Sequence, residues 1–267
     1  MSHAAAEEPL YPSTIARSAV RRVFQLRGAL VTAALTPLVL FVALDSAVGL
    51  VTESEWRYVF AALYQAPVVL FAVLWHRVIL AGVRPTLLGP LAWSRVHSAF
   101  LLYGLVIWLL SEVVDRLPSE GSAVAAMLML GPVAVYIEAR VAPLLPSAAV
   151  GGTSSPIVAW ALSNGNGWRL ALTGLMAALL AALLSAPVWL AALALGPRLQ
   201  YLGKPATLIA AAVYDAAYLF GLAIEVTALS LAFQHLSGPT RAAQHLSGPV
   251  ASSDADPPSG NAVTRRR

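Results

Sequence analysis

The chain has 267 residues, of which 58% are hydrophobic and only 11% are charged, and its mean hydropathy is +0.73. This composition excludes an ordinary soluble domain and favours a helix bundle in lipid. The formal net charge is +4, but the basic residues lie beside apolar segments and do not form one patch. We therefore expect anionic lipid headgroups as partners of these residues, and no nucleic acid.

The N-terminal region contains a predicted helix before the first apolar segment. Residues 1–12 are polar and alanine-rich, which predicts disorder. Residues 13–27 place apolar side chains at helical spacing and arginines on the other face, as in an amphipathic helix on a membrane surface. A plain charged lead-in to the first span is the alternative. The predicted apolar face consists of Ile15, Ala16, Ala19, Val20, Val23 and Phe24.

Six apolar segments within residues 28–236 match the length of about 20 residues that crosses a bilayer. The loops between them divide the seventeen Lys and Arg residues into thirteen on one side and four on the other. Because basic residues collect on the cytoplasmic side, we expect both termini in the cytoplasm. The fold class is thus all-α, a polytopic bundle of three hairpins with short cytoplasmic interfacial helices. The predicted spans are residues 29–51, 58–80, 97–114, 122–137, 168–195 and 206–233.

Two further segments lie outside these spans. In the loop from Glu138 to Gly167, Ser155 before Pro156 predicts the start of a short helix, and the run from Asn164 to Gly167 ends it. Residues 237–267 lack apolar periodicity and are rich in Pro, Ser and Gly, so we expect a disordered tail. The sequence QHLSGP occurs at 234–239 and again at 244–249, and it indicates no defined role.

Small residues predict how the last two spans pack. Ala177, Ala181 and Ser185 lie at four-residue spacing in the fifth span, and Ala217 and Gly221 offer a similar face in the sixth. Since lipid supplies no hydrophobic drive between helices, such faces allow close packing. We expect them to meet inside the bundle or at the interface of a homo-oligomer or membrane partner.

Acidic residues within the spans are candidates for an intramembrane polar site. A carboxylate at mid-bilayer costs about 2.5–3.5 kcal/mol, so Asp215 and Glu225 should face protein or water. With Tyr218 they lie on one stripe of the sixth span. The functional hypothesis is an ion or proton relay, and the structural alternative is a buried acid hydrogen-bonded to a neighbour. Asp45 and Glu112 lie nearer the outer ends of their spans, where solvation makes a structural role the stronger hypothesis.

A second group of candidates lies at the cytoplasmic interface. His76 and Arg77 end the second span, where they could bind a phosphate or simply anchor the helix. Arg140, Trp160 and Arg169 are predicted on the same side.

No catalytic motif accompanies these residues. The chain lacks an H-E-x-x-H zinc motif, a G-x-S-x-G elbow and a Walker A loop, and no two histidines have metal-ligand spacing. With zero cysteines, thiol catalysis is excluded as well. We expect no enzyme activity, metal or cofactor.

Several short motifs lie in and beside the predicted loops: Trp75-His76-Arg77 with Leu80 and Gly82, Arg140 with Pro143 and Pro146, Ala159-Trp160, and Asn166 to Leu170. These motifs resemble those of a group of uncharacterised multi-span bacterial inner-membrane proteins. More distantly, the layout is similar to the membrane region of some glycerophosphodiester phosphodiesterases. The resemblance covers residues 15–236 and implies no substrate, and Val83 and Asn164 depart from its charged positions.

The sequence therefore predicts a multi-pass protein of the bacterial inner membrane. Sixteen arginines to one lysine, with abundant alanine, favour a GC-rich bacterial genome as the source. The leading hypothesis is a non-enzymatic scaffold, assembly or envelope-maintenance factor. The alternative is a transporter or permease component, which would need Asp215 or Glu225 to line a cavity open to water.

Overall fold

The computed structural model describes residues 10–48, 56–115, 122–152, 155–201 and 203–246, and within these ranges every regular element is helical. The all-α prediction is confirmed for this part of the chain. The elements are α1 (Pro12–Gln25), α2 (Arg27–Val48), α3 (Trp56–Ala81), a 3-10 turn η1 (Gly89–Leu91), α4 (Arg95–Asp115), α5 (Ser122–Val141), α6 (Leu144–Ala149), α7 (Pro156–Leu162), α8 (Gly167–Tyr201) and α9 (Lys204–Leu246).

Among the described residues, four segments are long and apolar enough to cross a membrane: all of α2, most of α3, and the apolar parts of α8 and α9. They correspond to the first, second, fifth and sixth predicted spans. The third and fourth predicted spans fall on α4 and α5, whose side chains between 107 and 130 lie outside the description.

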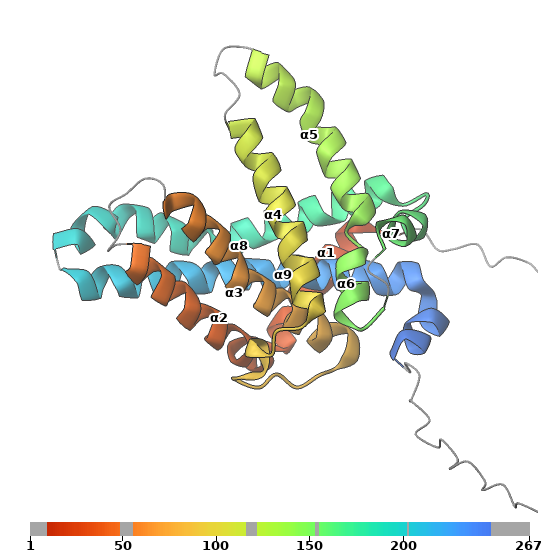
Figure 1. Ribbon diagram of the computed structural model, residues 1–267, viewed down its shortest axis with the longest axis horizontal. Helices are drawn as coiled ribbons and strands as arrows, with labels where there is room; N and C mark the ends of the chain where they lie inside the picture. The colour runs from red at the N-terminus through yellow and green to blue at the C-terminus, as the bar shows by residue number, and fades with distance from the viewer. Residues whose placement is uncertain (1–9, 49–55, 116–121, 153–154, 202, 247–267) are drawn as a thin grey trace, which may run out of the picture.

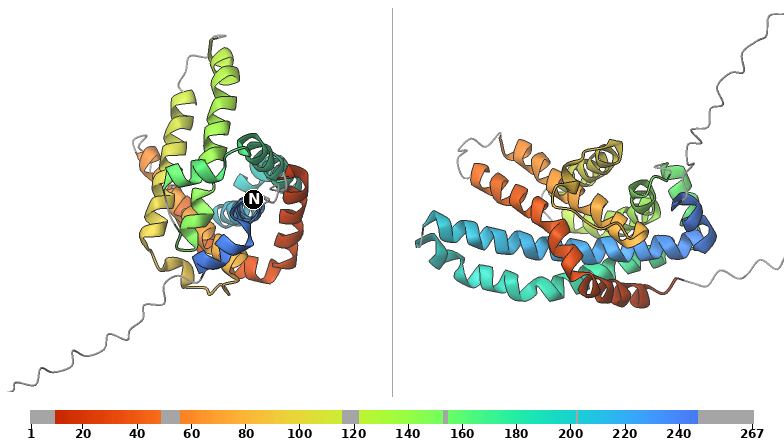
Figure 2. Two further views of the ribbon diagram at one scale, coloured as in Figure 1. Left: turned by 90° about the vertical axis from the view of Figure 1, so that its right-hand side faces the viewer. Right: turned by 90° about the horizontal axis from the view of Figure 1, so that it is seen from below.

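The long helices α8 and α9 organise the molecule. They run side by side along its longest dimension, and α1, α2 and α3 pack against α9 (Figure 1). Helices α4 and α5 leave this axis together and point in a different direction (Figures 1 and 2). α4 contacts α3, and α5 contacts α8.

Helix α1 forms where the amphipathic segment 13–27 was expected, and its apolar face packs within the chain. Ala16, Ala19 and Val23 are buried, and α1 packs on α8 and α9. The ring of Phe24, although 54% exposed, lies 5.7 Å from that of Phe220. Leu10, which the sequence places in a disordered segment, is buried against α5, α8 and α9, because an ordered α1 carries it there.

The core lies where α3 meets α9. Every residue from Phe71 to His76 is buried, since α3 is surrounded by α2, α4, α6 and α9. The Trp75 indole N–H donates to the Thr227 hydroxyl at 2.9 Å and lies 3.1 Å from the Ala223 carbonyl. A buried indole needs such a partner, and here it fixes the level at which α3 and α9 pack.

The predicted small-residue faces of α8 and α9 do meet inside the chain. Ala177, Ala181 and Ser185 are buried, and the Ser185 hydroxyl donates to the Ala217 carbonyl at 3.3 Å. A Cβ added at Gly221 would lie 3.5 Å from the Ala181 Cβ, an ordinary contact. The leucines on the opposite face of α8 are exposed.

The loop between the fourth and fifth spans holds more helix than predicted. α7 follows Ser155 as expected, and α6 precedes it without a clear sequence signal. At the other end, α9 bends at Gly238, whose φ of 68° favours glycine, and continues to Leu246. Helix therefore extends past residue 237, where the tail was expected to begin, and residues 1–9 and 247–267 lie outside the described part.

Candidate functional site

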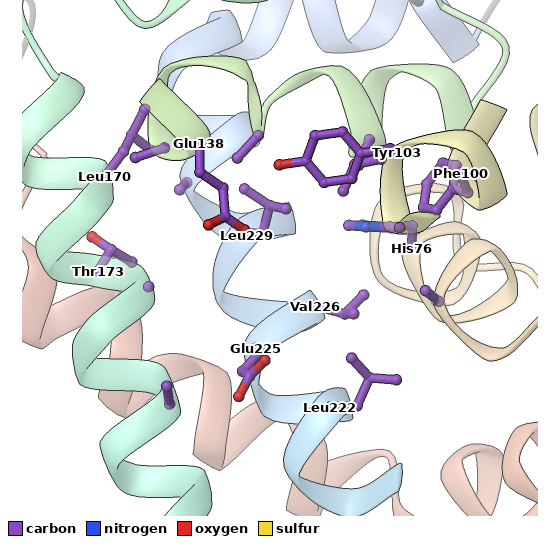
Figure 3. A pocket seen from close by; sticks show the side chains of 18 of the residues that line it. His76, Phe100, Tyr103, Glu138, Leu170, Thr173, Leu222, Glu225, Val226 and Leu229 are labelled. Carbon is purple, nitrogen blue, oxygen red and sulfur yellow. The ribbon is translucent and has the colours of Figure 1, made fainter. Parts of the chain in front are cut away.

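A cavity of about 490 Å³ lies between α3, α4, α5, α8 and α9. Its volume is within the range of small-ligand pockets, about 300–1,000 Å³. Side chains from all five helices point into it (Figure 3). The walls are mostly aliphatic, and six polar residues interrupt them: Gln65, His76, Tyr103, Glu138, Thr173 and Glu225.

Two carboxylates face this space from opposite helices, Glu138 from α5 and Glu225 from α9 (Figure 3). Neither accepts a hydrogen bond or forms an ion pair with any residue that the structure describes. Both glutamates are exposed, so their carboxylates remain accessible. The protein thus presents two carboxylates without a protein partner among the described residues at a cavity of ligand size.

Glu225 was a sequence candidate, whereas Glu138 was not. The sequence placed Glu138 at the end of the fourth span, where a carboxylate is ordinarily solvated. Its role at the cavity depends on α5 packing against α8, which brings it over α9. The sequence feature that could have identified Glu138 is its position two residues before Arg140, whose contacts fix the end of α5.

His76 also lines the cavity, on the side of α3 and α4. Its Nδ1 lies 2.8 Å from the Ser230 hydroxyl, which in turn donates to the Val226 carbonyl at 2.8 Å. The Ser230 hydroxyl has one proton, which it donates to the Val226 carbonyl. Nδ1 of His76 must then be the donor to the Ser230 oxygen, and Nε2 of the neutral imidazole is an acceptor. The Phe100 ring packs at 5.8 Å from the imidazole.

Arg140 has a structural role between α5 and α7. It is buried, and its two terminal nitrogens donate to the carbonyls of Ser163 and Trp160, each at 2.9 Å. The guanidinium lies 4.4 Å from the centre of the Trp160 ring, and the Ser163 hydroxyl donates back to the Arg140 carbonyl at 2.9 Å. Each terminal nitrogen thus donates to a carbonyl of the chain, and Nε is buried without a partner among the described residues. Such a buried guanidinium is poorly placed to bind a phosphate.

The remaining interface candidates do not converge on one site. Arg77 donates from Nε to the Ala149 carbonyl at the end of α6, at 2.8 Å. Arg169 is exposed and lies 3.5 Å from the Asn166 side chain. Of the five interface residues, only Arg140 and Trp160 touch, and His76 alone lines the cavity.

A second polar cluster joins α2, α3 and α9. The Tyr64 hydroxyl donates to Asp45, and the Asp45 side chain interacts with that of Asp215. Asp215 is only 7% exposed. Tyr218 lies on the same stripe of α9, with its ring 6.0 Å from that of Phe41. The structure therefore brings Asp45 and Asp215 together, and Asp45 is not merely a solvated residue at the end of a span.

The stripe predicted on α9 leads from this cluster to the cavity. Asp215 lies at the cluster, and Glu225 lies at the cavity. Ten residues of helix separate them by about 15 Å at 1.5 Å per residue. The side chain of Glu112, the fifth acidic candidate, lies outside the described residues.

Fold and composition define the class: an all-helical protein with four helices suited to cross a membrane, compatible with a multi-pass membrane protein. Comparison with protein-family models, with curated proteins and with solved structures finds no match to this chain. The resemblance carried by the loop motifs consequently stays a prediction.

Proposed function

We propose that this chain is a transporter or permease component that binds a small amphipathic organic cation in the cavity between α3, α4, α5, α8 and α9. The observation that carries the proposal is the pair of unpaired carboxylates, Glu138 and Glu225, in an apolar cavity. A cation placed between them would neutralise charge that the protein leaves exposed, and its apolar part would contact the aliphatic walls. Phe100 and Tyr103 add aromatic rings that attract cations.

The proposal places the protein in a bacterial inner membrane with six spans, three hairpins and cytoplasmic termini. The asymmetric loop arginines support this orientation. α4 and α5 would be the third and fourth spans, inclined to α8 and α9 (Figure 1).

The cavity favours ligand binding over the scaffold hypothesis. A scaffold needs no hollow lined by charged groups, and Glu225 faces open space instead of packing against a neighbouring helix. The small-residue faces that could have held a partner are used within the chain, between α8 and α9. The proposal includes no chemical reaction.

Equilibrium dialysis with tetraphenylphosphonium tests the proposal on the detergent-solubilised full chain. The double variant Glu138→Gln/Glu225→Gln should bind this cation at least about 10-fold more weakly, because a charged interaction contributes about 1.5–3 kcal/mol and 1.4 kcal/mol is tenfold. Glu225→Asp, which keeps the charge, should retain most of the affinity.

Neutral triphenylphosphine oxide is the matched control ligand, because it shares the aromatic body and lacks the charge. Its binding should be weak and should not change in the double variant. Equal binding of both ligands, or wild-type affinity for the cation in the double variant, would contradict the proposal.

A further inference from the structure

The cluster of Asp45, Tyr64 and Asp215 lies outside the proposed cavity, and it contains a buried carboxyl oxygen without a hydrogen-bond donor among the described residues. Oδ2 of Asp215 is fully buried and receives no hydrogen bond from any donor in the described residues. Its close neighbour is another carboxyl, that of Asp45 on α2. A buried acceptor without a donor costs about 1–3 kcal/mol, so a native structure normally supplies one.

A proton supplies the missing donor. Two ionised carboxylates have only acceptors and repel each other, whereas one proton between them makes a hydrogen bond and removes one charge. The Tyr64 hydroxyl already donates to Asp45. Asp45 therefore has a donor, and Asp215 is the carboxyl that still lacks one among the described residues.

The surroundings offer no alternative source of positive charge. α2 contributes Asp45, α3 contributes Tyr64, and α9 itself carries Tyr214 and Tyr218 near this level. On α8, Ser185 lies beside Ala217 and Trp189 lies beside Tyr214. Neither the serine nor the tryptophan side chain carries a charge. Within the described ranges, no lysine, arginine or histidine forms an ion pair with either aspartate.

We propose that Asp45, Tyr64 and Asp215 form a proton-binding site, in which the two carboxyl groups share one exchangeable proton. Loss of that proton would leave two adjacent carboxylates between α2 and α9, so the contact between these helices depends on proton occupancy. The site stands independently of the cation cavity, which lies about 15 Å farther along α9.

Infrared difference spectroscopy on the full-length protein in lipid nanodiscs tests this site. Labelling with [¹³C]aspartate separates aspartic from glutamic acid bands. The wild type should show a protonated aspartic acid band at neutral pH, and Asp215→Asn should abolish it. Glu225→Gln is the matched control, because it removes a carboxylate of the same helix outside the cluster and should leave the aspartic band unchanged.

If Asp215→Asn does not fold, Asp45→Asn provides the second test. The proton on Asp215 would then donate to an amide instead of a carboxylate, so the band should shift in frequency. Three results would overturn the assignment: no aspartic acid band in the wild type, a band unaltered by both aspartate variants, or loss of the band when sodium chloride replaces choline chloride. The last result would assign a sodium site.

Discussion

The substitution Gly167→Ala tests whether the end of α5 is fixed against the start of α8. A Cβ at position 167 would lie 2.7 Å from Cδ of Arg140 and 2.7 Å from Cε2 of Tyr136. Carbon atoms in favourable contact are about 3.5–4.0 Å apart, so both neighbours would have to move. Neither moves freely: Arg140 is held by its two carbonyl contacts, and the Tyr136 ring packs 4.9 Å from that of Trp168.

The expected magnitude follows from two opposing terms. Overpacking a close contact costs about 1–3 kcal/mol, whereas alanine gains at most about 0.5–1 kcal/mol over glycine in a helix. Subtracting the gain from the cost gives a net loss of roughly 0–2.5 kcal/mol, centred on about 1 kcal/mol. Glu138 lies two residues before Arg140, so displacement of α5 should also weaken tetraphenylphosphonium binding.

Thermal unfolding in detergent, followed by circular dichroism, measures the first effect, and dialysis measures the second. A loss of 1 kcal/mol lowers Tm by about 2–4 °C in domains approaching this size. Gly28→Ala is the matched control, because Gly28 also lies at the start of a helix and a Cβ there would have no neighbour within 4 Å. Equal melting temperatures for the two variants would refute the packing between α5 and α8.

Two further predictions concern other contacts of the bundle. Arg140→Lys should lower the free energy of unfolding by about 1–3 kcal/mol in a detergent melt. The reason is that a single ammonium group cannot donate to both carbonyls and stacks poorly on the Trp160 ring. Unchanged stability would show that the guanidinium contacts are dispensable. Ala181→Leu should destabilise the contact between α8 and α9 by about 1–3 kcal/mol, whereas Leu183→Ile on the exposed face should change the stability little. Equal losses of stability in the two variants, measured in the same melt, would contradict the assigned faces.

The sequence predicted those features that depend on local periodicity and composition. The amphipathic spacing of residues 13–27 gave α1, and apolar length gave α2, α3, α8 and α9. The small-residue spacing around Ala181 and Gly221 located the contact between the last two spans, because four-residue spacing keeps such side chains on one helix face.

The sites depend on contacts between distant segments, which local patterns do not specify. Asp45 and Asp215 meet only because α2 and α3 pack beside α9. Glu138 faces Glu225 only because the Arg140 contacts and Gly167 position the end of α5. Periodicity identified Asp215 and Glu225 as unusual residues, but it could not assign one to a carboxyl cluster and the other to a cavity.

Thiol accessibility tests whether a ligand cavity lies beside Glu225. The chain has no cysteine, so a single substitution reports without background. Gly174 lines the cavity and has room for a Cβ, whereas Leu183 on the same helix is 69% exposed on the face expected to contact lipid.

In proteoliposomes, a membrane-impermeant, positively charged methanethiosulfonate should modify Gly174→Cys readily, and tetraphenylphosphonium should slow that reaction. Leu183→Cys should react slowly, with no effect of the cation. If Gly174→Cys reacts no faster than Leu183→Cys, or if the cation gives no protection, the cavity is not the proposed cation-binding site.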